Sequence, residues 1–337
     1  ETLDGSALAA IRHEIETNNM EAVPLEKAPR IAVYTPPNSS PWDDAVTLAL
    51  EYAEIPYEKI WDRDVLSEAL DNYDWLHLHH EDFTGQYSKF YLTYASSAWL
   101  QEEVARNEAI ARELGYDNVP SLKKAVAHRL REYVHAGGFL FAMCTATETL
   151  ELALAAEEVD IAASFADGSP LDLGASEKLD WSTTMAFQGA VLVTDPTLSA
   201  FSDIDGHQVN TPWRVDLGSY ALFDFSAKFD PVPAMLTQNH RRVLADFYGL
   251  TTTFRDERLR PGVTVLAEEE GRGRVKYLHG NLGEGTFTYL GGHDPEDPRH
   301  LIGDAVTDLD LHRHSPGYRL ILNNILFPAA KKKKLKT

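Results

Sequence analysis

Cys144 is the only cysteine in a chain of 337 residues, and its surroundings suit a nucleophile. An apolar run over residues 139–143 predicts a buried strand, and a helix-compatible stretch begins directly after the cysteine. A sharp strand-to-helix turn presents one side chain at the carboxyl end of the strand and aims backbone N–H groups at a ligand. Ala142 and Ala146 are small enough for such a turn. The alternative is a buried cysteine that only fills space.

A cysteine nucleophile needs a base that holds it as the thiolate, usually a histidine, and an acid that orients this base. His293 is the best candidate for the base, because it follows a predicted strand at residues 287–290 and two glycines that permit close backbone approach. Asp294 and Glu296 lie beside it as candidate acids. The three residue types together predict nucleophilic attack on a carbonyl group.

A second cluster of imidazole and carboxylate groups closes another predicted strand: His77, His79, His80, Glu81 and Asp82. Such groups suit a divalent metal, so a metal-dependent hydrolase that uses His79, His80 and Glu81 is one alternative. However, alternate residues of a strand point to opposite faces, which separates His80 from His79. We therefore predict no metal and no cofactor. We expect His80 and Glu81 to contact substrate and Gly85 to offer an N–H to an oxyanion.

Strands that alternate with helices must position these residues. The predicted strands lie at residues 30–35, 57–61, 75–79 and 139–143, and the predicted helices at 43–52, 65–70, 88–114 and 122–136. This order predicts an α/β fold, a flavodoxin-like parallel sheet with helices on both faces. Ligands of such sheets bind at the carboxyl ends of the strands, which is where both reactive clusters fall.

The rest of the chain is expected to frame this sheet. Residues 1–28 form an N-terminal helix and connector, 29–330 form a single domain, and 331–337 form a lysine-rich tail. Within the domain, residues from about 157 to 265 have short apolar runs among Gly, Pro, Asp and Thr, which predicts a β-rich insertion. An apolar stripe predicts a closing helix at 316–326.

Composition limits the partners. The net charge of −21 argues against nucleic acid, and no apolar run is long enough to span a bilayer. A single cysteine cannot form an internal disulfide. The first residue is Glu1, with no charged-then-apolar leader, so a preceding segment is expected to have been removed or to lie outside this sequence.

Several motifs resemble known proteins. The Cys144 turn, the Gly291-Gly292-His293 loop and the closing helix resemble the class I glutamine amidotransferase-like superfamily, including its ThuA-like branch. Four runs and the lysine tail also resemble Bacteroidetes-type proteins labelled "asparagine synthetase B", and the similarity covers residues 28–337. The four runs are residues 41–50, 79–87, 291–297 and 315–319.

This resemblance implies a thiolate that attacks the carboxamide of a small-molecule or peptide-like substrate, and it suggests an exported protein. By position, Cys144 would be the nucleophile, His293 the base and the Thr145 N–H an oxyanion donor. The superfamily places its acid two residues after the histidine, where this chain has Pro295, so Glu296 or Asp294 would replace it. A non-catalytic, ThuA-like carbohydrate- or peptide-binding module is the alternative on the same fold.

Overall fold

The computed structural model describes residues 4–37, 44–206, 218–230, 237–297 and 305–330, so the predicted lysine tail at 331–337 lies outside the described residues. The α-helices are α1 Gly5–Thr17, α2 Ala45–Tyr52, α3 Asp62–Val65, α4 Tyr91–Tyr94, α5 Ala98–Glu113, α6 Val119–His135, α7 Thr145–Ala155, α8 Ser164–Asp167, α9 Ala175–Lys178, α10 Pro316–Leu322 and α11 Leu326–Ala329. The strands are β1 Ile31–Tyr34, β2 Glu58–Ile60, β3 Trp75–Leu78, β4 Phe139–Met143, β5 Ser219–Leu222, β6 Val243–Ala245, β7 Phe254–Arg255, β8 Thr264–Glu269, β9 Arg274–Leu282 and β10 Gly285–Leu290.

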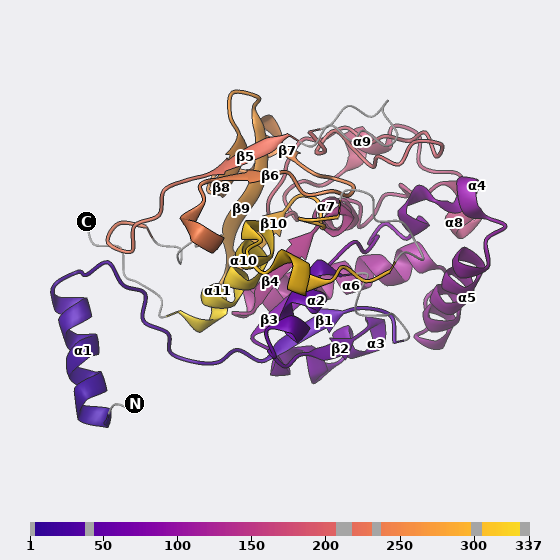
Figure 1. Ribbon diagram of the computed structural model, residues 1–337. Coiled ribbons are helices and arrows are strands. Elements are labelled where there is room, and N and C mark those ends of the chain that lie inside the picture. Colours follow the sequence, from indigo (N-terminus) through magenta and orange to yellow (C-terminus); the bar gives the residue numbers. More distant parts are fainter. Residues whose placement is uncertain (1–3, 38–43, 207–217, 231–236, 298–304, 331–337) are drawn as a thin grey trace.

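The strands form one mixed sheet in the order β2-β1-β3-β4-β10-β9-β8-β5-β6, with β7 paired to β9 (Figure 1). The neighbours from β2 to β10 are parallel, whereas β9, β8, β5 and β6 continue the sheet in antiparallel pairs. The prediction of a flavodoxin-like parallel sheet is therefore wrong. A tight connection between β9 and β10 reverses the chain, and antiparallel strands need no covering crossover helix.

Helices lie on both faces of the parallel part of the sheet. Alternate residues of β3 and β4 enter two separate hydrophobic cores. One core contains Leu76 and Leu140 with the apolar faces of α6 and α7, and the other contains Trp75 and Phe141 with α2 and α10. This separation follows from the two-residue repeat of a strand. It places His77, the histidine of β3, on the same side of the sheet as Trp75.

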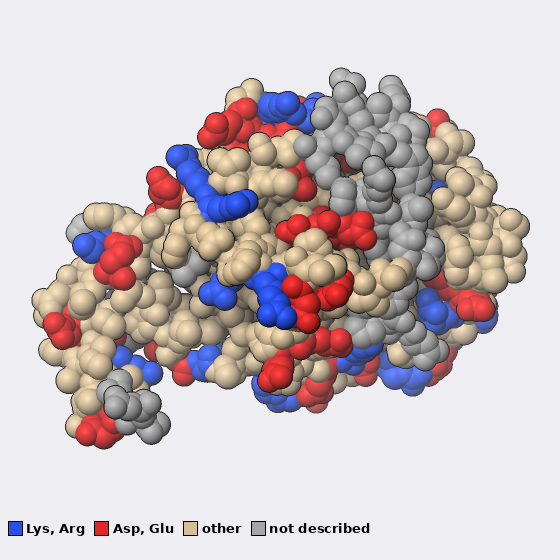
Figure 2. Space-filling view, viewed as in Figure 1, with Lys and Arg blue, Asp and Glu red and all other residues tan. Residues whose placement is uncertain are grey.

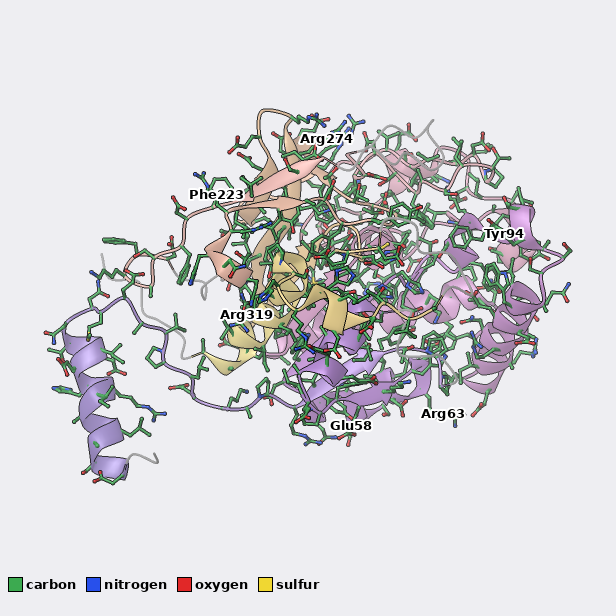
Figure 3. The ribbon with its side chains drawn as sticks, viewed as in Figure 1. Glu58, Arg63, Tyr94, Phe223, Arg274 and Arg319 are labelled. Carbon is green, nitrogen blue, oxygen red and sulfur yellow. The ribbon has the colours of Figure 1, made fainter. Side chains whose placement is uncertain are left out.

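The antiparallel part comes largely from the predicted insertion. Between about residues 157 and 265 the chain supplies α8, α9, β5, β6, β7 and the start of β8, and these strands extend the main sheet. Strand β9 was not predicted, because Lys276, Gly280 and Asn281 interrupt its apolar pattern. Figure 3 labels Glu58 on β2 and Phe223 after β5 at opposite ends of this long sheet.

The predicted helix at 88–114 is broken. Tyr87, Ser88 and Lys89 have positive φ angles of 54°, 53° and 58°, which a right-handed helix cannot contain. The Asp82 carboxylate fixes this turn by accepting the Ser88 N–H at 2.8 Å. Regular helix begins only after the turn, as α4 and then α5.

Two features concern the outer surface. Helix α1 stands apart from the sheet and its covering helices in Figure 1, and none of its residues is buried. Figure 2 shows Lys and Arg interspersed with Asp and Glu among the described residues of the visible face. Within the described ranges, none of the helices combines the length and apolar character needed to cross a membrane, as expected.

Candidate active site

Cys144 occupies the turn between β4 and α7, and its backbone is strained. It has φ 52° and ψ −137°, a conformation that non-glycine residues rarely adopt and that costs about 1–3 kcal/mol. Two contacts hold it: the Cys144 N–H extends the β4–β10 ladder to the Leu290 carbonyl at 3.3 Å, and the Thr147 hydroxyl donates to the Cys144 carbonyl at 2.6 Å. Ala142 and Ala146 are fully buried beside the turn. The predicted strand-to-helix elbow is therefore present.

The Cys144 sulfur contacts the His293 ring, with Sγ and Nδ1 separated by 3.3 Å. Burial raises the pKa of the Cys144 thiol, but the His293 charge, its hydrogen bond and contacts with Thr145 outweigh this effect and lower the pKa below its ordinary value. Burial lowers the pKa of His293, but the charge and hydrogen bond of the Cys144 sulfur outweigh burial and raise the pKa above its ordinary value. These opposite shifts favour a thiolate–imidazolium pair.

A backbone loop on the antiparallel side holds His293 in place. The Tyr248 N–H donates to the Asp294 carbonyl at 2.9 Å, and the His293 N–H donates to the Tyr248 carbonyl at 2.7 Å. In addition, the N–H of the preceding residue, Gly292, donates to the Thr251 carbonyl at 3.1 Å. Because these bonds are between main-chain groups, the position of His293 depends on the path of residues 246–252.

Gly249 is a site residue that the sequence reasoning missed. Its φ is 134°, and a Cβ added there would lie 2.4 Å from His293 Nδ1 and 3.3 Å from Cys144 Sγ. Only glycine lets the main chain come this close to the reacting pair. One glycine among 21 gives no signal of this role in the sequence, since the role depends on a tertiary contact.

The two predicted oxyanion donors differ in their placement. The Thr145 N–H is at the first position of α7 and donates toward the Cys144 sulfur, where the helix dipole also favours negative charge. Gly85 lies elsewhere: its N–H donates to the Asp82 carbonyl at 3.2 Å, and a Cβ on it would meet the Pro120 backbone at 2.8 Å. The Gly85 N–H is directed at Asp82, whereas the Thr145 N–H is directed at the Cys144 sulfur, so Thr145 is the donor that the geometry favours.

Neither candidate acid bonds to the His293 ring. The Asp294 carboxylate accepts the N–H groups of Glu296 and Asp297 at 3.1 and 2.8 Å and so closes its own turn. Burial raises the pKa of Asp294, while its charge contributes to the raised pKa of His293. Glu296 instead lies 3.4 Å from His312 Nδ1. In the described part of the molecule, the expected Cys–His–acid triad therefore lacks its acid, and only the Cys144–His293 pair is present.

The predicted cluster of imidazole and carboxylate groups at the end of β3 approaches His293 through two of its histidines. The His79 ring is buried and its centroid lies 5.0 Å from that of His293, whereas the His80 ring is exposed at 6.3 Å. Burial raises the pKa of Glu81 to about 8, and its carbonyl accepts the Thr149 hydroxyl at 2.8 Å. Within the described ranges, no three His, Cys, Asp or Glu side chains are grouped to hold a metal ion.

The sequence did not predict the buried pair that Asp44 forms with His77 next to this cluster. Asp44 caps α2 by accepting the Val46 N–H at 2.8 Å, and its carboxylate lies 2.9 Å from His77 Nε2. The other ring nitrogen, Nδ1, faces the Phe141 carbonyl at 3.2 Å. Burial raises the pKa of Asp44, but His77 and His79 outweigh it and hold the pKa low. Both nitrogens of His77 thus lie within hydrogen-bond distance of a carbonyl or carboxylate oxygen, which fixes the plane of its ring.

A buried ammonium group supports the loop over the site. Lys276 on β9 bonds to the Asp246 carboxylate and donates to the Thr252 carbonyl at 2.8 Å. Burial lowers the pKa of Lys276, and the negative charges of Asp246 and the Cys144 sulfur oppose that. Lys276 therefore anchors both ends of residues 246–252 and contributes positive potential near the sulfur.

Comparison with known proteins gives no sequence relative, since no family model and no curated protein matches the chain. Among solved structures it is similar to two cytoplasmic proteins of Salmonella typhimurium, each 11% identical, with TM-scores of 0.40 and 0.42 over 90% of this chain and 100% of theirs. It is also similar to β-galactosidase from Bacillus circulans, with 10% identity and a TM-score of 0.39. That match covers 90% of this chain and only 31% of the β-galactosidase. At this level the similarities define neither fold nor activity, so the chemistry must follow from the site.

Proposed function

We propose that this protein is a cysteine-dependent amide hydrolase, with Cys144 as nucleophile and His293 as base. The observation that carries the proposal is the 3.3 Å contact between Sγ and Nδ1 at a strained strand–helix elbow. The resemblance of the elbow and the Gly-Gly-His loop to class I glutamine amidotransferases supports a carboxamide in a small-molecule or peptide-like substrate. The raised pKa of His293 and the lowered pKa of Cys144 support a reactive thiolate.

In the first half of the reaction, the Cys144 thiolate attacks the carbonyl carbon of the amide. The carbonyl oxygen becomes an oxyanion and accepts the Thr145 N–H at the start of α7. The His293 imidazolium then gives its proton to the leaving nitrogen, the C–N bond breaks, and ammonia or an amine departs. The products of this half are a thioester on Cys144 and a neutral His293.

In the second half, the neutral His293 takes a proton from water, and the hydroxide attacks the thioester carbonyl. Collapse of this second tetrahedral intermediate breaks the C–S bond and releases the carboxylic acid. The thiolate–imidazolium pair is restored, because the proton taken from water stays on His293. One water is consumed for each amide cleaved.

The test uses p-nitrophenyl acetate, which acylates reactive thiolates without a specific binding site. We expect a burst of p-nitrophenol and one acetyl group on Cys144, located by peptide mass spectrometry. Cys144→Ser should lose the burst, and His293→Ala should slow it by about 10²–10⁴-fold. Ammonia release from glutamine and other carboxamides then tests the substrate class. Equal p-nitrophenol release by the wild type and Cys144→Ser would overturn the proposal, provided that thermal unfolding shows both to be folded.

A further inference from the structure

Among the residues that the structure describes, no acid bonds to the His293 ring. Cys144 is the one hydrogen-bond partner of the ring in the described part of the chain, and Asp294 and Glu296 are engaged elsewhere. In Cys–His–acid sites the acid fixes the orientation of the imidazole, so that one nitrogen faces the sulfur. Without that bond, the ring would be free to rotate about its side-chain torsions. Some other contact must hold its plane.

His79 makes the contact that geometry allows. It follows the last residue of β3, and β3 lies beside β4, whose last residue, Met143, precedes Cys144. The ring is 4% exposed, and it meets the His293 ring at 90° with 5.0 Å between centroids. This is the edge-to-face arrangement that aromatic rings prefer. Gly249 lies against Nδ1 of the same ring, so the His293 imidazole is confined by contacts with both residues.

His79 is itself held from behind. Its ring lies 6.3 Å from that of His77, which is on the same side of β3. His77 is fixed at both nitrogens, by the Phe141 carbonyl and the Asp44 carboxylate. Burial lowers the pKa of His79, and the positive charges of His80, His293 and His77 lower it further, against the opposing effect of Asp44. A neutral ring can pack against the His293 imidazolium without repulsion.

We propose that His79 is the positioning residue of this site and takes the place of the missing acid by packing its ring edge-to-face against His293. This inference rests on the proposed Cys144–His293 chemistry. It assigns the orientation of the base to ring contact, whereas the nitrogen atoms of His79 have no part in it. Nε2 of His79 has no hydrogen-bond partner among the described residues, in agreement with this role.

Three substitutions separate ring packing from polar contact. His79→Phe keeps a flat ring and removes both nitrogens, His79→Gln keeps a polar group and removes the ring, and His79→Ala removes both. Ultraviolet absorbance of the thiolate, with Cys144→Ser as the blank, gives the Cys144 pKa without any substrate. The acylation rate with p-nitrophenyl acetate gives the second measurement. Thermal unfolding confirms that each variant is folded, and Glu296→Gln is the matched control for the acid.

We expect His79→Ala and His79→Gln to raise the Cys144 pKa toward about 8.5 and to slow acylation by about two- to tenfold, the worth of one aromatic pair. His79→Phe should stay closer to the wild type than either, and Glu296→Gln should equal it. If all three His79 variants equal the wild type, if His79→Gln retains wild-type values, or if His79→Phe is as impaired as His79→Ala, the inference is wrong. An ordinary Cys144 pKa and no acylation in the wild type would instead overturn the proposed function.

Discussion

Replacing Gly249 with alanine is the most direct perturbation of the reacting pair. The added methyl carbon would lie 2.4 Å from Nδ1 and 2.9 Å from Cε1 of His293, and 3.3 Å from Cys144 Sγ. Non-bonded heavy atoms are most stable at about 3.5–4.0 Å, so the ring must retreat by roughly 1 Å. The backbone bonds from Tyr248 and Thr251 hold the loop and the His293 main chain together, which leaves the ring as the group that moves.

The size of the effect follows from this displacement. A misplacement of about 1 Å in a catalytic group costs on the order of 10²-fold in rate, so acylation of Cys144 in Gly249→Ala should fall by about that factor. The thiolate also loses its closest positive charge, so the Cys144 pKa should rise toward its ordinary value of about 8.5. In addition, the φ of 134° is unfavourable for alanine and should cost about 1–3 kcal/mol of stability.

Gly137→Ala separates backbone strain from the clash. Gly137 has a similar φ of 120°, but the nearest atom to its added Cβ is Glu284 Cβ at 3.8 Å, an ordinary contact. Thermal unfolding, thiolate absorbance and p-nitrophenyl acetate acylation should be measured for both variants. We expect comparable destabilisation in the two, with loss of thiolate and acylation only in Gly249→Ala. Wild-type acylation and thiol pKa in Gly249→Ala would refute the placement of His293 beside this loop.

Three further predictions concern charge. The rate of amide cleavage by the wild type should be bell-shaped between about pH 5 and 10, because the thiolate attacks and the imidazolium protonates the leaving nitrogen. The rate should rise through the Cys144 pKa, which lies below about 8.5, and fall through the His293 pKa, which lies above about 6.5; a single rise near 8.5 would exclude the ion pair. Lys276→Met leaves Asp246 buried without its partner, so urea unfolding should show a loss of about 3–5 kcal/mol, and Asp246→Asn in the same chain should restore much of it. Burial raises the pKa of Glu148 on α7 to about 8, so in the folded state this group keeps a proton that the unfolded state releases near 4.5. Glu148 should therefore lower wild-type stability by about 1.4 kcal/mol per pH unit between these values, in addition to a similar contribution from Glu81. Glu148→Gln should reduce the slope measured in thermal unfolding by about that amount; an equal slope in the variant and the wild type would contradict the assignment.

The sequence predicts the reacting pair because its signal is local. Cys144 and His293 each follow an apolar strand, β4 or β10, and the carboxyl ends of parallel neighbours meet at one edge of the sheet. The acid could not be predicted in the same way. Glu296 is near His293 in sequence, but the turn that Asp294 closes directs it to His312.

Other errors arise from hydrogen bonds that no local pattern shows. Gly85 has the residue type expected of an oxyanion loop, but a bond to the Asp82 carbonyl and packing against Pro120 use its backbone. Strand β9 was missed because Lys276, which would be excluded from a buried strand by hydropathy, is satisfied there by Asp246. In each case a tertiary partner determines what the residue does.

The mixed sheet is what makes the site possible in its present form. The three adjacent strands β3, β4 and β10 bring His79, Cys144 and His293 to one edge, and parallel pairing alone accounts for that. Among the described residues, these strands provide no acid for the His293 ring, and they contact its Nδ1 side only through the Cys144 sulfur. The missing support comes from the loop between β6 and β7, which carries Gly249 and is anchored by Lys276 on the antiparallel strand β9. The antiparallel half of the sheet therefore supplies and anchors the loop that packs Gly249 against the reacting pair.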